Sequence, residues 1–112
     1  ELAAKGFPDA RDLAAMPHGR RVSYVGAIIC RQRPGTAGGV TFLTLEDETG
    51  FVNVVIWKDV WKRYGLTVKT NPVIGLTGQL EARQGVSHLI VEHAWVPRLS
   101  RRTAMAKSRN FH

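Results

Sequence analysis

Apolar and polar residues alternate along most of the chain, and this pattern predicts β-strands. Residues 21–33 follow a period of two, are rich in β-branched and aromatic side chains and end at Pro34, so they predict a long first strand. Residues 40–47 and 51–58 predict two further strands. The acidic residues between them end at Gly50, which favours a tight turn. These segments predict a three-stranded meander.

The second half of the chain predicts a helix and then a hairpin. Residues 57–65 break the alternation, place Val60 and Tyr64 four positions apart and end in a glycine, which is typical of a short helix. Residues 71–96 return to a period of two, and residues 83–85 are expected to form the turn. The predicted order is three strands, one helix and two strands.

This order predicts an all-β fold, a five-stranded Greek-key barrel of the oligonucleotide/oligosaccharide-binding (OB) type. A small sandwich and an SH3-like barrel are the alternatives, but neither expects a helix after the third strand. Gly26, Gly75 and Gly78 suit strands that bend sharply around a small barrel.

We expect three parts in the chain. Residues 1–20 predict a helical or irregular lead-in, in which Asp9 is placed to cap a short helix that Pro17 ends. Residues 21–97 predict the barrel, and residues 98–112 a basic tail. Because the chain begins with glutamate and not with methionine, it is open whether it is a piece of a longer protein.

Alternation also sorts the two central strands into an inner and an outer face. The inner set is aliphatic: Leu43, Leu45, Val52, Val54 and Ile56. The outer set is aromatic and polar: Phe42, Thr44, Phe51, Asn53 and Trp57. Aromatic side chains on this face of an OB barrel stack on the bases of single strands, with about 1–3 kcal/mol for each base. The outer set is therefore a candidate site for single-stranded nucleic acid.

Basic residues near this face are candidates for phosphate contacts. Arg31 and Arg33 lie two positions apart, so we expect both on one side of the first strand and along the same groove. Lys58 and His88 are further candidates. Two alternatives stay open, because the lead-in or the tail can cover the aromatic side chains and the arginines can pair with the carboxylates of residues 46–48.

The net charge of +7 is concentrated in the tail. Residues 97–112 hold five basic and no acidic residues, whereas residues 22–96 hold seven basic and six acidic residues. Charge alone does not make the barrel a nucleic-acid binder. The tail predicts either a solvated end or nonspecific phosphate contacts, for which the candidates are Arg101, Arg102, Lys107 and Arg109.

Catalytic and metal sites are not indicated. Glu46, Asp47 and Glu48 are explained by the turn, and the histidines lack the spacing of metal ligands. Cys30 is a single cysteine in an apolar run, so we expect a small core side chain and a reducing, cytoplasmic setting. We expect no cofactor in this domain and, without a long apolar stretch, no membrane contact.

The stretch "GRRVSYVGAIICRQRPGTAGGVTFLTLEDETGFVNVVIW" resembles the C-terminal OB domain of bacterial C-family (DnaE-type) DNA polymerases. Its part "RQRPGTAGGVTFLTLEDETG", together with the closing "SRNFH", resembles the error-prone ImuC branch. The resemblance covers residues 18–112. It implies a noncatalytic module of a DNA-directed DNA polymerase, a nucleotidyltransferase that serves translesion synthesis in DNA repair and binds magnesium in an upstream palm domain.

The resemblance also implies partners for the module. These are single-stranded template DNA, the upstream polymerase domains, an ImuB-type Y-family protein and the sliding clamp. The alternative is a protein-interaction adaptor that uses the same aromatic side chains to dock on the ImuB-type partner or on another polymerase domain.

The binding face is also similar to the anticodon-binding domains of class II aminoacyl-tRNA synthetases. That likeness implies that Phe42 stacks on a base and that Asn53 reads one, with Arg31 nearby.

Overall fold

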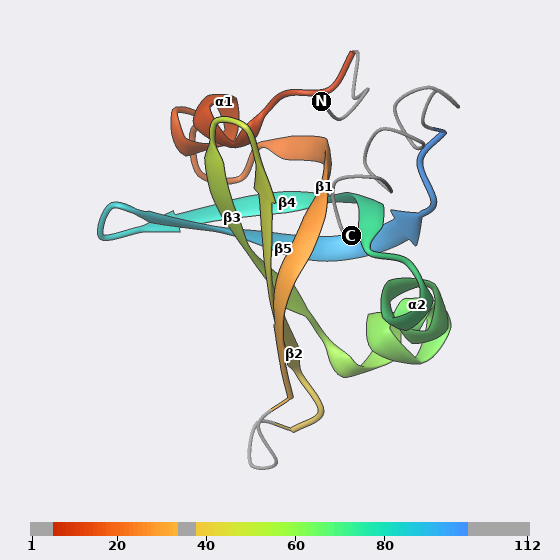
Figure 1. The fold of residues 1–112 in the computed structure, drawn as a ribbon. Helices are drawn as coiled ribbons and strands as arrows, with labels where there is room; N and C mark the ends of the chain where they lie inside the picture. Colours follow the sequence, from red (N-terminus) through yellow and green to blue (C-terminus); the bar gives the residue numbers. More distant parts are fainter. Residues whose placement is uncertain (1–5, 34–37, 99–112) are drawn as a thin grey trace.

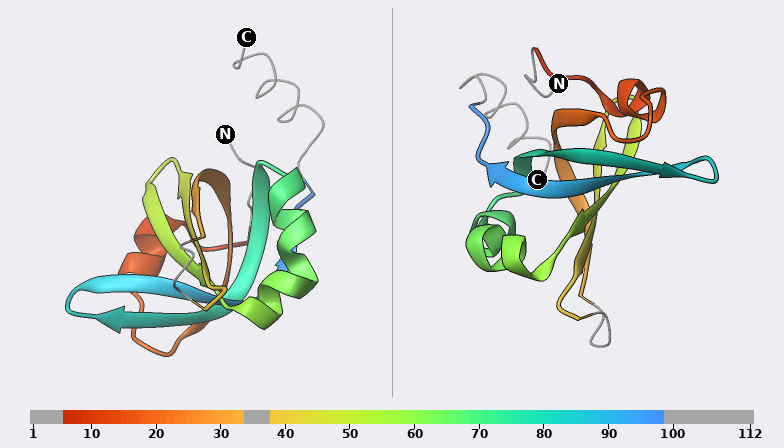
Figure 2. Two further views of the ribbon diagram at one scale, coloured as in Figure 1. Left: turned by 90° about the horizontal axis from the view of Figure 1, so that it is seen from below. Right: turned by 180° about the vertical axis from the view of Figure 1, so that it is seen from behind.

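The computed structural model describes residues 6–33 and 38–98, which form a closed five-stranded barrel with one helix at each end (Figures 1 and 2). The elements follow the order α1 (Ala10–Ala14), β1 (Arg21–Gln32), β2 (Thr41–Asp47), β3 (Gly50–Ile56), α2 (Lys58–Thr70), β4 (Val73–Arg83) and β5 (Val86–Trp95). Around the barrel the strand order is β1-β2-β3-β5-β4. The predicted fold class is therefore confirmed.

One parallel contact closes the barrel. All other neighbouring strands are antiparallel, and β3 pairs with β5 in parallel through partners such as Val54 and Leu89. The predicted second hairpin is also confirmed. Its turn places Gln84 at φ 54° and Gly85 at φ 79°, and this pair of positive values is typical of a two-residue turn between twisted strands.

The core is formed by the inner faces of the strands. The five aliphatic residues predicted for it are all at most 6 % exposed: Leu43, Leu45, Val52, Val54 and Ile56. They pack with Tyr24, Leu76 and Leu89, which are fully buried. Removing any one large aliphatic side chain from such a cluster costs about 2–5 kcal/mol.

The lead-in helix α1 docks on one end of the barrel, and the turn between β2 and β3 completes its N-terminus. Asp9 is the predicted cap: its side chain accepts from the Asp12 amide, and its own amide donates to Asp12 Oδ2 at 3.0 Å. The first two helical amides donate instead to the turn: Ala10 N to Asp47 Oδ2 at 2.8 Å and Arg11 N to Thr49 Oγ1 at 3.1 Å. All four free amides of a helix start are thus paired.

This arrangement also explains the acidic turn. Asp47 Oδ1 accepts from the amide and the hydroxyl of Thr49, both at 2.7 Å. Partial burial acts to raise the pKa of Asp47, but the hydrogen bonds from Thr49 and Ala10 outweigh it and hold the pKa below its ordinary value. In residues 6–33 and 38–98 no group of three or more histidine, cysteine, aspartate or glutamate side chains is placed to hold a metal ion. The acidic turn between β2 and β3 therefore serves to dock helix α1.

The helix between β3 and β4 is longer than the sequence predicts. It does not end at Gly65 but runs on to Thr70, so the predicted boundary is wrong. Gly65 is buried within the helix, and a Cβ there would lie 2.9 Å from Cε2 of Trp61. Gly65 therefore makes room for the Trp61 ring. The helix ends later, where residue 71 precedes Pro72. Neither helix in the described part of the chain is long and apolar enough to cross a membrane.

A β-bulge interrupts the alternation of β1. Ile28 pairs with Leu45 of β2, but the next partner pair is Cys30 with Thr44, so Ile29 is an extra residue. Ile28 points inward with Leu45, whereas Cys30 points outward with Thr44. The expectation that Cys30 is a core side chain is therefore wrong, and its side chain is exposed. From the bulge onward, every side chain of β1 lies on the face opposite to the predicted one.

Candidate nucleic-acid interface

The outer face of β2 and β3 carries the predicted aromatic and polar side chains. Phe42 is 38 % exposed and Phe51 is 66 % exposed, although both belong to strands whose other faces are buried. Asn53 is exposed, and along the strands it lies between the level of Phe51 and the level of Phe42. Thr44 is half-buried. The predicted division of these two strands into faces is confirmed.

The strand register aligns these residues in two rows across the barrel. In one row, Thr44 lies opposite Asn53, and Asn53 lies opposite His88 of β5. In the next row, Phe42 lies opposite Val55, and Val55 lies opposite Ile90. Directly paired residues share a face, so the first row is polar and the second is apolar. His88, predicted only as a separate candidate, is thus brought next to Asn53.

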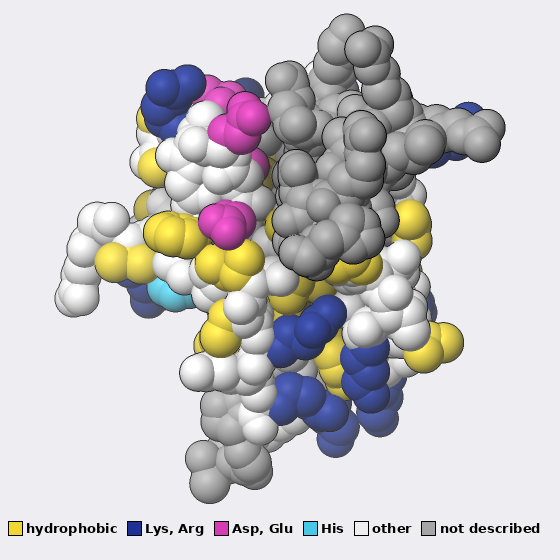
Figure 3. Space-filling view, in the orientation of Figure 1, with side chains coloured by type: hydrophobic (Ala, Val, Ile, Leu, Met, Phe, Trp, Pro, Cys, Tyr) yellow, Lys and Arg dark blue, Asp and Glu magenta, His cyan; other side chains and the backbone are white. Residues whose placement is uncertain are grey.

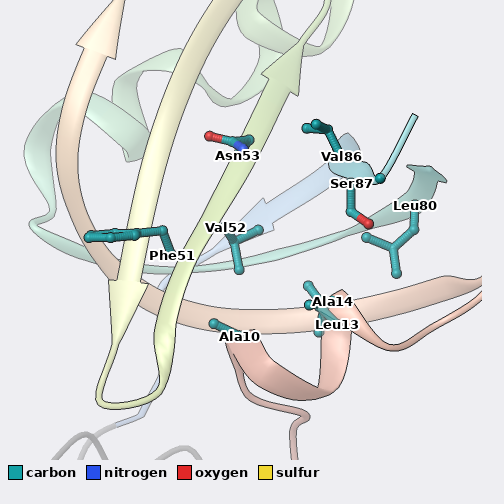
Figure 4. A pocket seen from close by; sticks show the side chains of 10 residues that line it. Ala10, Leu13, Ala14, Phe51, Val52, Asn53, Leu80, Val86 and Ser87 are labelled. Atoms are coloured by element: carbon teal, nitrogen blue, oxygen red, sulfur yellow. The ribbon is translucent and has the colours of Figure 1, made fainter. Parts of the chain in front are cut away.

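A small hollow continues this face toward α1. Its volume is about 200 Å³, and it lies between α1, β3 and the turn that joins β4 to β5. Phe51 and Asn53 project from β3 on one side, and Val52 projects on the other, toward Leu13 and Ala14 (Figure 4). The hollow is smaller than the roughly 300–1,000 Å³ of most cofactor and drug pockets. It adds a recess to an extended surface.

Arg31 and Arg33 do not line this face. Because of the bulge at Ile29, Arg31 pairs with Leu43, whose side chain points inward, and both arginines turn toward α2. The Arg31 guanidinium donates to the Val68 carbonyl at 3.0 Å, and that of Arg33 lies 5.1 Å from the ring centroid of Trp61. The expectation that they share a groove with Phe42 is therefore wrong in its geometry.

Two other candidates also belong to the α2 side. Trp57 is 55 % exposed, but it is the N-cap residue of α2 and not the end of β3. Lys58 is the first residue of α2, and its side chain lies beside Gly39 in the β1–β2 connection. The tail candidates Arg101, Arg102, Lys107 and Arg109 lie outside the described residues.

The described residues do not cover the aromatic face. Helix α1 packs against β3 and β5, while Phe42 keeps its exposure. The pairing of the arginines with the acidic turn is not seen either. The ion pairs among the described residues join Arg11 with Asp9 and Arg21 with Glu92.

Comparison with known proteins places this geometry in a family. The model of the OB-fold nucleic acid binding domain matches residues 22–97, which is more than half of the chain. The chain belongs to this OB-fold family. The family match includes the whole outer face of β2 and β3, so the exposed aromatic side chains lie within the matched residues.

Relatives of the OB domain are named error-prone DNA polymerase. The chain is 45 % identical over 95 residues to the protein of Pseudomonas savastanoi pv. phaseolicola, which covers 85 % of this chain and 9 % of that protein. It is 43 % identical to the protein of Pseudomonas fluorescens Pf0-1, with 100 % of this chain and 11 % of that protein covered. The resemblance to error-prone polymerases is thus confirmed, and the chain spans about a tenth of the length of these relatives.

Solved structures agree with the fold of the OB domain. An asparaginyl-tRNA synthetase from Pyrococcus horikoshii superposes with a TM-score of 0.69 and 20 % identity, and the match covers 85 % of this chain and 23 % of that one. The Stn1–Ten1 complex of S. pombe gives a TM-score of 0.56 at 18 % identity, with 83 % and 79 % covered. At these identities the likeness concerns the fold alone.

Sequence reasoning missed the surroundings of α2 in the OB domain. Trp61, Lys62 and Lys69 were not among the candidates, although Trp61 is half-buried between Arg33 and Lys69. The signal was the spacing of the α2 lysines at positions 58, 62 and 69, close to whole turns of a helix.

Proposed function

We propose that this OB domain is a noncatalytic module of an error-prone DNA polymerase that serves translesion synthesis, and that it binds single-stranded template DNA. The observation that carries the proposal is the outer face of β2 and β3. It presents Phe42 and Phe51 to solvent on either side of a polar row, within a family of nucleic-acid-binding domains. Apolar surface that is grouped on one face of a folded domain and bordered by polar residues marks interaction sites.

Each part of the face has a separate role in this proposal. The two phenylalanines stack on bases, which tolerates any base because every base has a π-face. Asn53 and Thr44 hydrogen-bond to base edges, and His88 adds a donor or acceptor beside Asn53. The face lacks a lysine or arginine among the residues paired in its two rows, so we expect weak, sequence-tolerant binding.

The chemistry of the parent enzyme lies outside this domain. We propose that nucleotidyl transfer and its magnesium ions belong to an upstream palm domain and that the OB domain positions the template strand for it. The relatives named error-prone DNA polymerase support this assignment. The proposed setting is the cytoplasm, and the proposed protein partners are an ImuB-type Y-family protein and the sliding clamp.

A fluorescence-anisotropy titration with a labelled single-stranded oligonucleotide tests the binding face. We expect Phe42→Ala to weaken binding by about tenfold, since stacking contributes about 1–3 kcal/mol for each base. Leu66→Ala is the matched control, because Leu66 is 75 % exposed on α2, away from β2 and β3. It should leave the affinity unchanged.

Two results would contradict the proposal: no detectable binding at low salt, or equal losses from the two substitutions. A pull-down with the Y-family partner, with and without Phe42→Ala, then tests the adaptor function. Loss of capture in that variant, together with absent DNA binding, would assign the aromatic face to a protein partner.

A further inference from the structure

Five basic side chains lie on α2 and at the end of β1 next to it. We call residues 28–33 and 38–45 the β1–β2 arm, and the two arginines of the five lie on the side of this arm opposite Phe42. This basic cluster consists of Arg31, Arg33, Lys58, Lys62 and Lys69. The Arg33 guanidinium and the Lys69 ammonium lie 5.1 and 5.8 Å from the Trp61 ring centroid. Arg31 reaches the Val68 carbonyl from β1, so strand and helix are joined here.

Helical geometry places the three lysines on one flank of α2. Lys62 and Lys69 follow Lys58 by four and eleven residues, close to one and three full turns of 3.6 residues. The Lys58 side chain lies beside Gly39, which fixes this flank next to the β1–β2 arm. Arg63, one residue after Lys62, lies about 100° further around the helix and is exposed on the other flank.

The cluster has five basic side chains, whereas Asp59, in the first turn, is the one acidic residue of α2. None of its five members forms an ion pair with a described carboxylate. In the space-filling view, lysine and arginine side chains gather over α2 and the lower part of the β1–β2 arm, and the acidic side chains lie over α1 and the β2–β3 turn (Figure 3). The barrel therefore has a positive end.

The cluster offers charge without a free aromatic surface. Gly65 lies against the Trp61 ring, and Arg33 and Lys69 lie near the ring as well, so the tryptophan holds cations and is not free to stack on a base. A surface of this kind suits a phosphate backbone. The density of phosphates along the axis is highest in a duplex, with about one charge per 1.7 Å.

We propose that this basic cluster binds the phosphate backbone of double-stranded DNA. The site is separate from the face of β2 and β3, because the two lie on opposite sides of the β1–β2 arm. Together they fit a junction, with the single strand on the aromatic face and the duplex against α2. Five phosphate contacts should contribute about −4.5 to the slope of log K against log salt.

A titration of the 112-residue chain with a blunt, labelled duplex tests the proposal. We expect Lys62→Glu to weaken duplex binding at least tenfold at low salt and to flatten the salt dependence. Arg63→Glu is the matched control, because it makes the same change of charge on the next residue of the same helix. It should weaken binding less than threefold. The basic tail is identical in both variants, so its contribution cancels.

Three outcomes would overturn the proposal. Equal losses from Lys62→Glu and Arg63→Glu would reduce the effect to net charge. An equal loss for a single-stranded oligonucleotide would assign the cluster to the same strand as the aromatic face. Displacement of the duplex by poly-glutamate of matched charge, as effective as displacement by unlabelled duplex, would assign the cluster to an acidic protein. Thermal melts of both variants check that they fold.

Phe42→Ala separates this proposal from the function proposed above. That substitution should weaken single-strand binding and leave duplex binding unchanged, and Lys62→Glu should do the reverse. Each proposal can therefore fail without the other.

Discussion

At each end of the barrel, a charged side chain forms a hydrogen bond with the backbone of the helix there, and the two side chains have opposite charges. At the α1 end, the Asp47 carboxylate accepts from the first helical amide, that of Ala10. At the α2 end, the Arg31 guanidinium donates to Val68, one of the last carbonyls of the helix. Each contact matches the helix dipole, which is positive at the N-terminus and negative at the C-terminus.

The two ends differ in how completely they are held. Helix α1 has only five residues, and hydrogen bonds satisfy its whole N-terminus. Helix α2 has thirteen residues and a Trp57 N-cap without a side-chain hydrogen bond, and it buries Val68 completely. A helix this short depends on its capping contacts because it is not stable by itself. A longer amphipathic helix can rely on packing, and the lysines on its flank stay exposed.

The strongest test of this difference is Asp47→Ala. It removes the acceptor for Ala10 and Thr49, so we expect a loss of about 2 kcal/mol in the free energy of unfolding, measured with urea. Glu48→Ala is the control, because Glu48 is exposed and its side chain makes no hydrogen bond with a described residue. Equal losses would show that α1 is not held by this carboxylate.

The same carboxylate predicts an acid dependence. Because the folded pKa of Asp47 is lower than its ordinary value of 3.8, its contribution is complete above that value and is lost as the pH falls through the folded pKa. The difference in unfolding free energy between wild type and Asp47→Ala should therefore be constant near neutral pH and shrink below about pH 4. A difference that grows on acidification would contradict this.

A smaller effect is expected at the other end from Arg31→Met. The variant keeps an aliphatic stem but loses one hydrogen bond to a backbone carbonyl, which contributes about 1 kcal/mol. Arg63→Met serves as the control on the outer flank of α2. If urea unfolding shows that Arg31→Met costs as much as Asp47→Ala, then α2 depends on its polar contact as strongly as α1.

The smallest effect is expected from Tyr24→Phe, in the part of the core beside Asp47. The Tyr24 hydroxyl is buried and has no hydrogen-bond partner among the described residues, so its removal should be neutral or slightly stabilising at pH 7. Burial, with the Asp47 carboxylate nearby, raises the pKa of Tyr24. Wild-type stability should therefore fall as the pH rises above about 10, and Tyr24→Phe should resist this fall in thermal melts. A marked loss at pH 7 would show that the hydroxyl donates to the Asp47 carboxylate.

The fold could be predicted because several local signals agreed. The aliphatic positions of residues 43–45 and 52–56 specify a buried face, and the turns at Gly50 and Gly85 contain residues suited to positive φ. The end of α2 could not be predicted from Gly65. A glycine can end a helix or make room for a neighbouring ring such as that of Trp61, and the sequence does not distinguish the two roles.

The candidate site was predicted on β2 and β3 and misplaced on β1. Strict alternation held for Phe42 and Asn53, but it failed after Ile28, where one extra residue reverses the faces. No residue type marks this bulge, since Ile29 is as good a strand former as its neighbours. This one extra residue explains both errors: Cys30 was predicted on the inner face and Arg31 on the outer face, and the structure has them the other way round.

The bulge at Ile29 makes the surface chemistry of the arm depend on chain length. Deleting this one residue would leave every charge and aromatic ring in the protein, yet it would move Arg31 and Arg33 from the α2 side to the side of Phe42. A relative with a one-residue gap at this position would therefore present a different combination of basic and aromatic side chains on each face of the sheet. Differences between such relatives would be visible in an alignment as an indel and not as a substitution.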